Sequence, residues 1–170
     1  MREHAPIIAS IDHIGIVDAL YRFGAGQDLR DRELLESAFA AEAELDFRGA
    51  AGRLGAELPV FEGRREIVDT IIASIRDLDT THTVSNPRVT ASDGARASLV
   101  ALVEAQHLPR VDHSRHLLLK NFYFADLVRD GSRWLIERLR IDNVWYDGEP
   151  AVLFPNARAR GTGPEEDTHA

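Results

Sequence analysis

Apolar residues recur at intervals of three and four along the start of the chain, which is the spacing of one helix face. This stripe consists of Ile7, Ile11, Ile14, Val17, Tyr21 and Gly24. Four residues further on it reaches Asp28, within the stretch YRFGAGQDLRD. A carboxylate on an apolar stripe costs free energy unless a partner satisfies it, so we expect Asp28 to line an internal pocket. A helix N-cap or an exposed loop acid is the alternative interpretation.

Two more helices and a short strand are predicted next. Asp31 is the natural N-cap of a helix over residues 32–40, and residues 43–48 alternate as a strand. Residues 49–59 contain three glycines and a proline, so we expect a loop there, and a flap beside a pocket is one interpretation of it. The third helix spans residues 64–78. Its buried stripe is formed by Ile67, Val68, Ile71, Ile72, Ile75 and Leu78.

The second half of the chain reads as strands joined by tight turns. The stretch THTVSNPRVT alternates as a strand, and its Pro87 indicates an edge position or a bulge. Further strands are predicted over residues 95–108, 113–128 and 134–145. Asp-Gly turns precede the first of these strands, at Asp93-Gly94, and the last, at Asp130-Gly131. Segregated helices over a curved antiparallel sheet give an α+β fold, and the short turns favour a meander.

Composition narrows the function classes. A chain of 170 residues suits one domain, expected over residues 1–155, with a polar, disordered tail over residues 156–170. The net charge of −8 argues against nucleic acid as a partner, and no apolar run reaches the ~20 residues of a membrane span. Because cysteine is absent, thiol nucleophiles and zinc–thiolate sites are excluded. A cytoplasmic protein is the default expectation.

The order of these stretches resembles the SnoaL-like branch of the nuclear-transport-factor-2-like superfamily. The similarity rests on IVDALYRFGAGQDLRDRELLESAFAAEAELDF, FEGRREIVDTI, TTHTVSNPRV and the strand pair HLLLKNFYFADLVRDGSRWLIERLRIDNVWYDGEP. It implies a cone, in which a curved sheet wraps around three helices and encloses an apolar pocket. Members of this superfamily include scytalone dehydratase, lindane dehydrochlorinase, polyketide cyclases and accessory subunits of dioxygenases, so the fold does not settle the function.

The resemblance implies roles for two residues. Asp28 matches the pocket aspartate of the dehydratase-like members, and His82 in THTVSN matches their catalytic histidine. A neutral imidazole is a suitable base near neutral pH, and a carboxylate on its other nitrogen fixes the tautomer and stabilises the imidazolium. We therefore predict that His82 is a general base oriented by Asp28. Tyr21 either hydrogen-bonds a substrate oxygen or packs in the core.

Four other residues are candidates for binding substrate: His107, Asn121, Tyr123 and Trp145. Asn121 and Tyr123 share one strand face, but the sequence does not say whether that face lines the cone. For Trp145, packing at the sheet edge is the simpler interpretation. His107, His113 and His116 could suggest a metal cluster, but no acidic residue completes a ligand spacing, so we predict neither metal nor cofactor.

These features predict a cofactor-independent lyase of the dehydratase type, acting on a small cyclic or polyketide-like molecule. An isomerase or cyclase using the same base is an alternative, and a non-catalytic ligand-binding or accessory subunit is another. The resemblance also implies a homo-oligomer, a dimer or a trimer, with the outer face of the sheet as the contact surface.

Overall fold

Helices come first along the chain and long strands follow in the computed structural model, which describes residues 10–156. The elements are α1 (Ser10–Asp28), α2 (Arg32–Glu36), β1 (Phe39–Asp46), α3 (Arg48–Arg53), β2 (Phe61–Glu62), α4 (Arg64–Ser74), β3 (Leu78–Ser92), β4 (Arg96–Pro109), β5 (Leu117–Asp130), β6 (Arg133–Gly148) and the 3₁₀ turn η1 (Pro150–Val152). Within residues 10–156, no helix is both long and apolar enough to cross a membrane. The predicted disordered tail lies outside the described residues, apart from Asn156.

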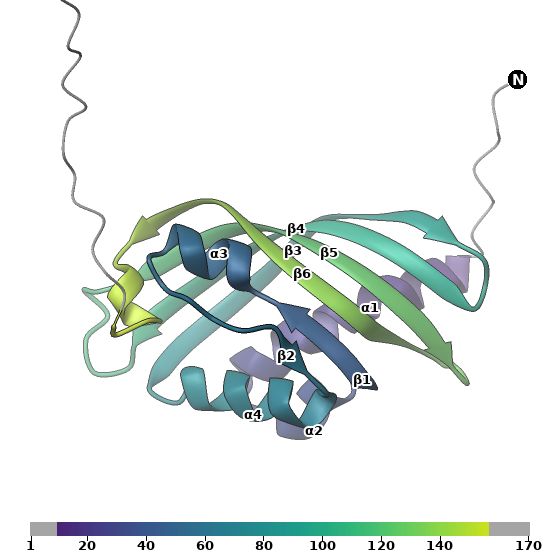
Figure 1. Ribbon diagram of the computed structural model, residues 1–170, viewed down its shortest axis with the longest axis horizontal. Helices are drawn as coiled ribbons and strands as arrows, with labels where there is room; N and C mark the ends of the chain where they lie inside the picture. Colours follow the sequence, from purple (N-terminus) through teal and green to yellow (C-terminus); the bar gives the residue numbers. More distant parts are fainter. Residues whose placement is uncertain (1–9, 157–170) are drawn as a thin grey trace, which may run out of the picture.

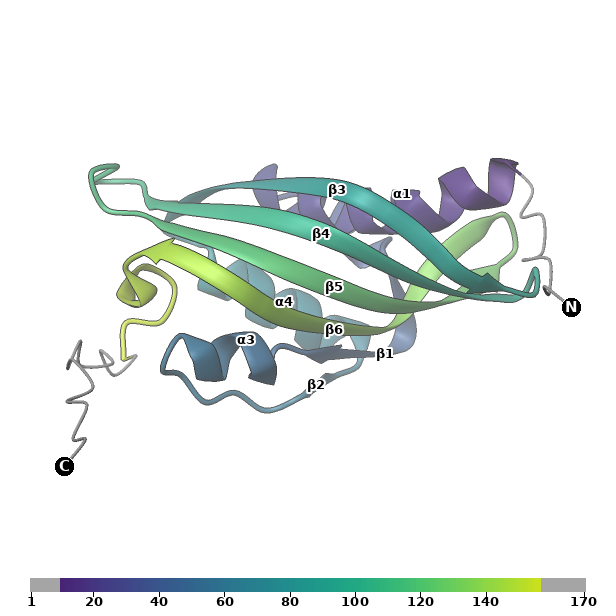
Figure 2. The ribbon, with the colours of Figure 1, turned by 90° about the horizontal axis from the view of Figure 1, so that it is seen from above.

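One curved, open sheet holds all the strands, in the order β2-β1-β6-β5-β4-β3. Strands β3 to β6 form an antiparallel meander, and α1, α2 and α4 lie against the concave side of the sheet (Figure 1). Seen from above, β3 forms one edge beside α1, while β1 and β2 form the other (Figure 2). The predicted α+β cone is therefore confirmed. One pairing differs, because β1 runs parallel to β6.

The buried face of α1 is rotated from the predicted stripe. Ile16, Leu20, Phe23 and Gln27 point into the core, at intervals of four, three and four residues. Ile14 and Tyr21 are 67% and 49% exposed, so their predicted inward position is wrong. Gly24 and Asp28 lie at the edge of the buried face, where α1 meets β3. Ile7 lies outside the described residues, and the side chain of Ile11 is likewise not described.

The two glycines near the end of α1 allow close packing on both sides. A Cβ on Gly24 would lie 3.1 Å from the Cβ of His82 in β3. A Cβ on Gly26 would lie 2.6 Å from the backbone nitrogen of Leu35 in α2. The helix continues regularly through both glycines to Asp28, because close approach here outweighs their weak helix propensity. The predicted N-cap of α2 is confirmed by Asp31, whose Oδ1 accepts from the Leu34 nitrogen at 2.9 Å.

Strand β3 occupies the edge position that its proline indicated. The pairing of β3 with β4 shifts register between Ser85 and Arg88, so Pro87 lies within a bulge and interrupts no regular ladder. Asn86, just before it, has a φ of 50°, in the left-handed region. Hairpin turns at Gly94 and Gly131 join the long strands as predicted.

Three local predictions need correction. Helix α2 ends at Glu36 rather than at residue 40, because β1 already begins at Phe39. A loop is predicted over residues 49–59, but helix α3 begins at Arg48 and packs against β6. Ala50 and Ala51 of this helix are buried. The glycines on either side of these alanines hid the helix, since a short amphipathic turn leaves little periodic signal. Helix α4 ends at Ser74 rather than at residue 78, although Ile75 is buried as expected.

We predict that Gly26→Ala destabilises the protein by about 1–3 kcal/mol, because its added methyl meets the α2 backbone, which cannot rotate away. The matched control is Gly52→Ala in α3, where an added Cβ meets nothing within 4 Å. That change should stabilise by about 0.5–1 kcal/mol through helix propensity. Urea denaturation measures both free energies of unfolding, and equal effects at the two glycines would contradict the packing assigned to Gly26.

Candidate active site

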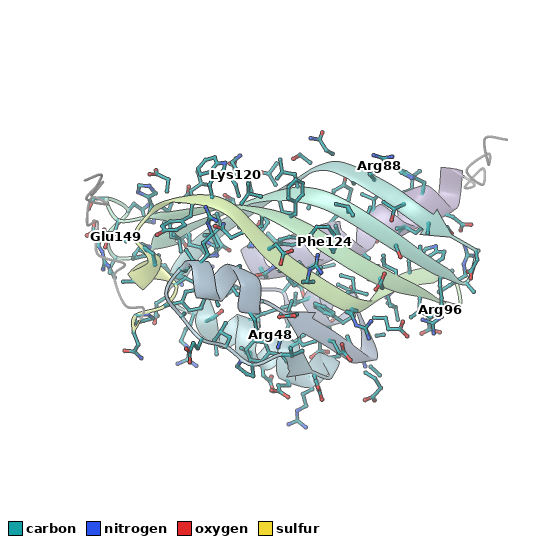
Figure 3. The ribbon with its side chains drawn as sticks, turned by 45° about the horizontal axis from the view of Figure 1, so that its top comes forward. Arg48, Arg88, Arg96, Lys120, Phe124 and Glu149 are labelled. Atoms are coloured by element: carbon teal, nitrogen blue, oxygen red, sulfur yellow. The ribbon has the colours of Figure 1, made fainter. Side chains whose placement is uncertain are left out.

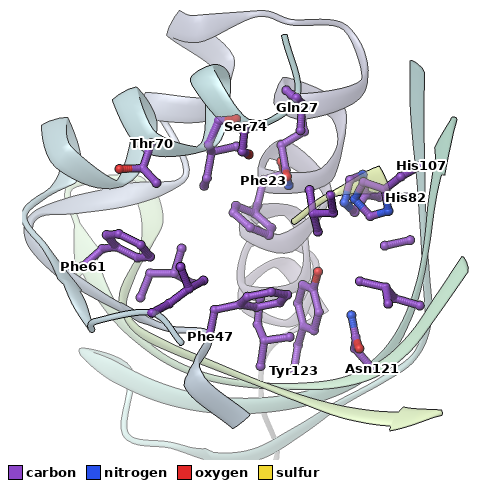
Figure 4. Close-up of a pocket in the computed structure, with 18 of the residues that line it drawn as sticks. Phe23, Gln27, Phe47, Phe61, Thr70, Ser74, His82, His107, Asn121 and Tyr123 are labelled. Carbon is purple, nitrogen blue, oxygen red and sulfur yellow. Dashed lines mark hydrogen bonds between the residues drawn. The ribbon is translucent and has the colours of Figure 1, made fainter. Parts of the chain in front are cut away.

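A cavity of about 260 Å³ lies between the concave face of the sheet and the helices. Its wall is mainly apolar, with contributions from α1, α4, the central strands and the segment that follows η1 (Figure 4). The volume is close to the lower end of the range for small-molecule sites, which is about 300–1,000 Å³. The polar groups in the wall are few: Gln27, Thr70, Ser74, His82, His107, Asn121 and Tyr123.

Asp28 and His82 meet at one side of this cavity. The Nδ1 of His82 lies 2.6 Å from Oδ1 of Asp28, and the backbone nitrogen of His82 donates to Oδ2 at 2.7 Å. The hydroxyl of Thr80 donates to Oδ1 at 2.9 Å. The carboxylate therefore accepts three hydrogen bonds, all of them from β3. We refer to Asp28 and His82 together as the dyad.

The partners of the dyad fix its protonation pattern. Burial alone would raise the pKa of Asp28, but the hydrogen bonds and charge of His82, together with Thr80, hold that pKa below its usual value. A carboxylate can only accept, so the hydrogen of the imidazole lies on Nδ1. The lone pair on Nε2 of His82 then faces the cavity, which the His82 side chain lines while being only 3% exposed.

The last turn of α1 is an unfavourable place for a carboxylate, because the C-terminal end of a helix carries partial negative charge. Asp28 is the final residue of α1, and its side chain is 21% exposed. Three hydrogen bonds from β3 offset this cost. Gly24, one turn earlier, lets the helix approach β3 closely enough for those bonds to form.

His107 packs beside the dyad on β4. Its ring lies edge-on to the ring of His82, with centroids 6.0 Å apart, and its Nδ1 is 3.3 Å from the carbonyl oxygen of Leu117. Burial and, to a lesser extent, the nearby charge of His82 lower the pKa of His107 to about 4. His107 is consequently neutral at pH 7 and presents Nε2 as an acceptor if Nδ1 donates to Leu117.

Asn121 and Tyr123 form a polar pair on β5, opposite the helices (Figure 4). They are 1% and 3% exposed, respectively. Burial raises the pKa of Tyr123 above its usual range, the charge of Asp28 adds to that rise, and a hydrogen bond from Asn121 offsets part of it. Tyr123 therefore keeps its hydroxyl proton and is a neutral hydrogen-bond donor. The strand face left open by the sequence is thus the one that lines the cone.

Two of the candidate residues lie outside the cavity. Tyr21 is on the exposed side of α1, and Trp145 is 47% exposed on the outer face of the sheet, with the Lys120 ammonium 5.9 Å from its ring centroid. The outer face is the one from which Lys120 and Phe124 project in Figure 3. Trp145 points outward because of a β-bulge in β6. Lys120 pairs with Trp145 and Asn121 pairs with Asn143, so Val144 is an extra residue that reverses the alternation of side chains.

The remaining histidines of the suggested cluster are separated from the cavity. His113 contacts Asp79 at 3.0 Å and His116 contacts Asp147 at 3.1 Å, both at exposed positions. Over residues 10–156, no group of three or more His, Cys, Asp or Glu side chains is arranged to hold a metal ion.

Two polar neighbours of the dyad and the cavity, Thr80 and Gln27, were not predicted from the sequence. Thr80 lies two residues before His82 and therefore on the same, inward face of β3. The alternation of side chains along a strand could have predicted this position. Gln27 is 7% exposed and lines the cavity, and its Nε2 donates to the Phe23 carbonyl at 3.1 Å. Its side-chain oxygen is left for the cavity. The rotated face of α1 is what concealed it.

A family model described as a SnoaL-like domain matches residues 10–140. The curated protein "Terrestric acid biosynthesis cluster protein E" of Penicillium crustosum is 29% identical over 148 residues, covering 84% of this chain and 89% of that protein. A solved protein assigned as a scytalone dehydratase from Novosphingobium aromaticivorans has a TM-score of 0.68 at 17% identity, covering 94% and 96%. A hexachlorocyclohexane dehydrochlorinase also has a TM-score of 0.68, at 15% identity, covering 91% and 95%. At these identities the two structures establish a shared fold.

The buried neutral histidine predicts how stability depends on pH. The pKa of His107 is about 4 in the folded protein, against about 6.5 for an unfolded chain. Between these values only the unfolded state binds the proton, so stability falls as the pH falls from 6.5 to 4, by about 3 kcal/mol. In His107→Gln this part of the pH dependence should disappear, as measured by urea denaturation at pH 4.5 and 7. The exposed His13→Gln is the control, and an unchanged pH slope in His107→Gln would contradict the prediction.

Proposed function

The chain belongs to the SnoaL-like domain family, and we propose that it is a cofactor-independent lyase in which His82 removes a proton from a carbon acid bound in the cavity. The substrate is a small, mostly apolar cyclic molecule, in keeping with the size and the apolar wall of the cavity. The observation that carries the proposal is the 2.6 Å contact between Asp28 and Nδ1 of His82, because it leaves Nε2 as a base facing that cavity.

The reaction is a β-elimination. Nε2 of His82 takes a proton from the carbon next to a carbonyl group, and the electron pair of that C–H bond forms the new C=C bond. The leaving group, hydroxide in a dehydration, departs from the neighbouring carbon and takes up the proton from His82, so that one water is lost overall. Asp28 holds the Nδ1 hydrogen and stabilises the imidazolium between these two events.

An isomerase or cyclase is the second candidate. The neutral donors on β5, Asn121 and Tyr123, support it, because they suit an enolate oxygen whether or not a leaving group departs. Both reactions begin with the same proton transfer to His82. They differ in whether exchange of the α-proton is accompanied by release of water or halide.

Assembly and location stay predictions. The outer sheet face exposes Phe122, Val144 and Trp145, which supports the expected homo-oligomer, and light scattering at micromolar concentrations would measure its size. The expected cytoplasmic location rests on the sequence alone.

We predict that His82→Gln lowers the rate of proton abstraction by about 10²–10⁴-fold. Asp28→Asn should also lower it strongly, because an amide oxygen cannot accept all three hydrogen bonds that the carboxylate accepts. The assay is a panel of one- and two-ring β-hydroxy and β-halo ketones in D₂O. NMR measures α-deuterium exchange, and ultraviolet absorbance measures the conjugated enone.

The control variant is His113→Gln, an exposed histidine outside the cavity, which should behave as the wild type. Exchange with release of the leaving group supports the lyase, and exchange alone supports the isomerase. If the wild type binds members of the panel but exchanges no proton, or if His82→Gln exchanges as fast as the wild type, the proposed base is wrong.

A further inference from the structure

The bulge in β6 leaves two backbone carbonyls near the side chain of Asn143. The extra residue, Val144, separates Asn143 from Trp145, and Asn143 pairs across the sheet with Asn121 on β5. The side-chain nitrogen of Asn143 donates to the carbonyl oxygen of Trp145 at 2.9 Å and lies 3.3 Å from that of Lys120. Its third acceptor is Oδ1 of Asn121, at 2.9 Å.

These acceptors fix the orientation of the Asn143 amide. If the amide turned over, its oxygen would face three other oxygens and no hydrogen, which costs free energy in a buried place. In the present orientation Oδ1 of Asn143 is buried and has no hydrogen-bond partner among the described residues. The cost of that unpaired acceptor is offset by the hydrogen bonds that the amide NH₂ donates to the bulge carbonyls and to Asn121.

The orientation of Asn143 determines the orientation of Asn121. Because Oδ1 of Asn121 accepts from Asn143, the other end of the Asn121 amide, its NH₂, is directed toward the cavity and toward Tyr123 (Figure 4). Tyr123 receives a hydrogen bond from Asn121 through its oxygen. The hydroxyl hydrogen of Tyr123 is then available to donate, and the hydroxyl points into the cavity in Figure 4. The hydrogen bonds therefore run in one direction, from Asn143 to Asn121 and from Asn121 to Tyr123.

We propose that Asn143 is a positioning residue that turns the donor ends of Asn121 and Tyr123 toward the cavity, and so commits this wall to a carbonyl or enolate oxygen of the substrate. Asn143 itself does not line the cavity and acts through Asn121. The inference rests on the proposed function only in taking that oxygen to belong to the carbon acid. The opposite side of the cavity has acceptors instead, on His82 and Gln27, so a ketone would bind in one direction.

The test measures hydrogen-bond donation to a bound ketone, with 1-tetralone labelled with ¹³C at the carbonyl carbon as the probe. In the wild type, its carbonyl resonance should move downfield of its position in cyclohexane, because the oxygen accepts hydrogen bonds from this wall. Asn143→Asp removes the donor while keeping the shape, so Asn121 turns its NH₂ toward the new carboxylate. The downfield shift should then shrink or vanish.

Two further variants keep the test decisive. Asn143→Ala also removes the donor but adds no charge, and it replaces Asn143→Asp if the latter fails to fold. Val144→Asp places the same charge on the neighbouring exposed residue and keeps the Asn143 amide, so the shift should match the wild type. The proposal is overturned if 1-tetralone shows no shift or no binding in the wild type. It is equally overturned if a folded Asn143 variant keeps the full shift.

The same variants separate this inference from the proposed function. Loss of one preorganised donor should lower kcat by about 10²-fold for an active ketone, with a smaller change in KM. His82→Gln should lower the rate of proton exchange by about 10²–10⁴-fold and leave the ¹³C shift in place. If the shift behaves as expected but no ketone exchanges a proton, the polarity of the wall stands and the lyase proposal fails. If proton exchange depends on His82 but the ¹³C shift does not change in the Asn143 variants, the lyase proposal stands and the role assigned to Asn143 is wrong.

Discussion

The site depends on how a half-buried carboxylate is satisfied. Asp28 ends α1, where the helix itself disfavours negative charge, and it is held there by three hydrogen bonds from Thr80 and His82. Those bonds tie the first helix to the edge strand β3, although the two residues of the dyad are 54 positions apart in sequence. The same contacts give His82 one tautomer and one direction. The contacts that bind the helix to the sheet are thus the same ones that orient the proposed base.

The cavity is polarised by the groups around it. Acceptors lie on the side of α1 and β3, and donors lie on β5, next to the bulge of β6 at Val144, from which the Asn143 amide donates to Asn121. The burial that lowers the pKa of His107 and raises that of Tyr123 keeps both groups neutral at pH 7. No Asp, Glu, Lys or Arg side chain is among the described residues that line the cavity. In the proposed reaction, protonation of His82 would therefore place a positive charge in a cavity wall that is otherwise neutral, so its electrostatic effect would be large.

Much of the fold could be predicted from local patterns, and the exceptions have identifiable causes. The alternation of β3 with its Pro87, the cap at Asp31 and the hairpin turns all encode their own structure over a few residues. Trp145 was misplaced because a bulge reverses alternation and leaves no mark in composition. Tyr21 was misplaced because a helix with apolar residues on several sides does not reveal which side is buried. The parallel pairing of β1 with β6 joins distant segments, so local sequence cannot predict it. The approach of Asp28 to His82 came from family resemblance, since spacing alone could not provide it.

The position of His82, the proposed base, on an edge strand has a consequence for aggregation. The outer edge of β3 offers backbone groups that another extended chain could pair with, and such edges are common starting points for aggregation. Two features of β3 work against that. The left-handed Asn86 and the proline that follows it bend the strand and remove a donor in its middle, and α1 packs against the same strand. Asn86 and Pro87, four and five residues after the proposed base His82, therefore also help to keep the molecule from pairing with its neighbours through this strand.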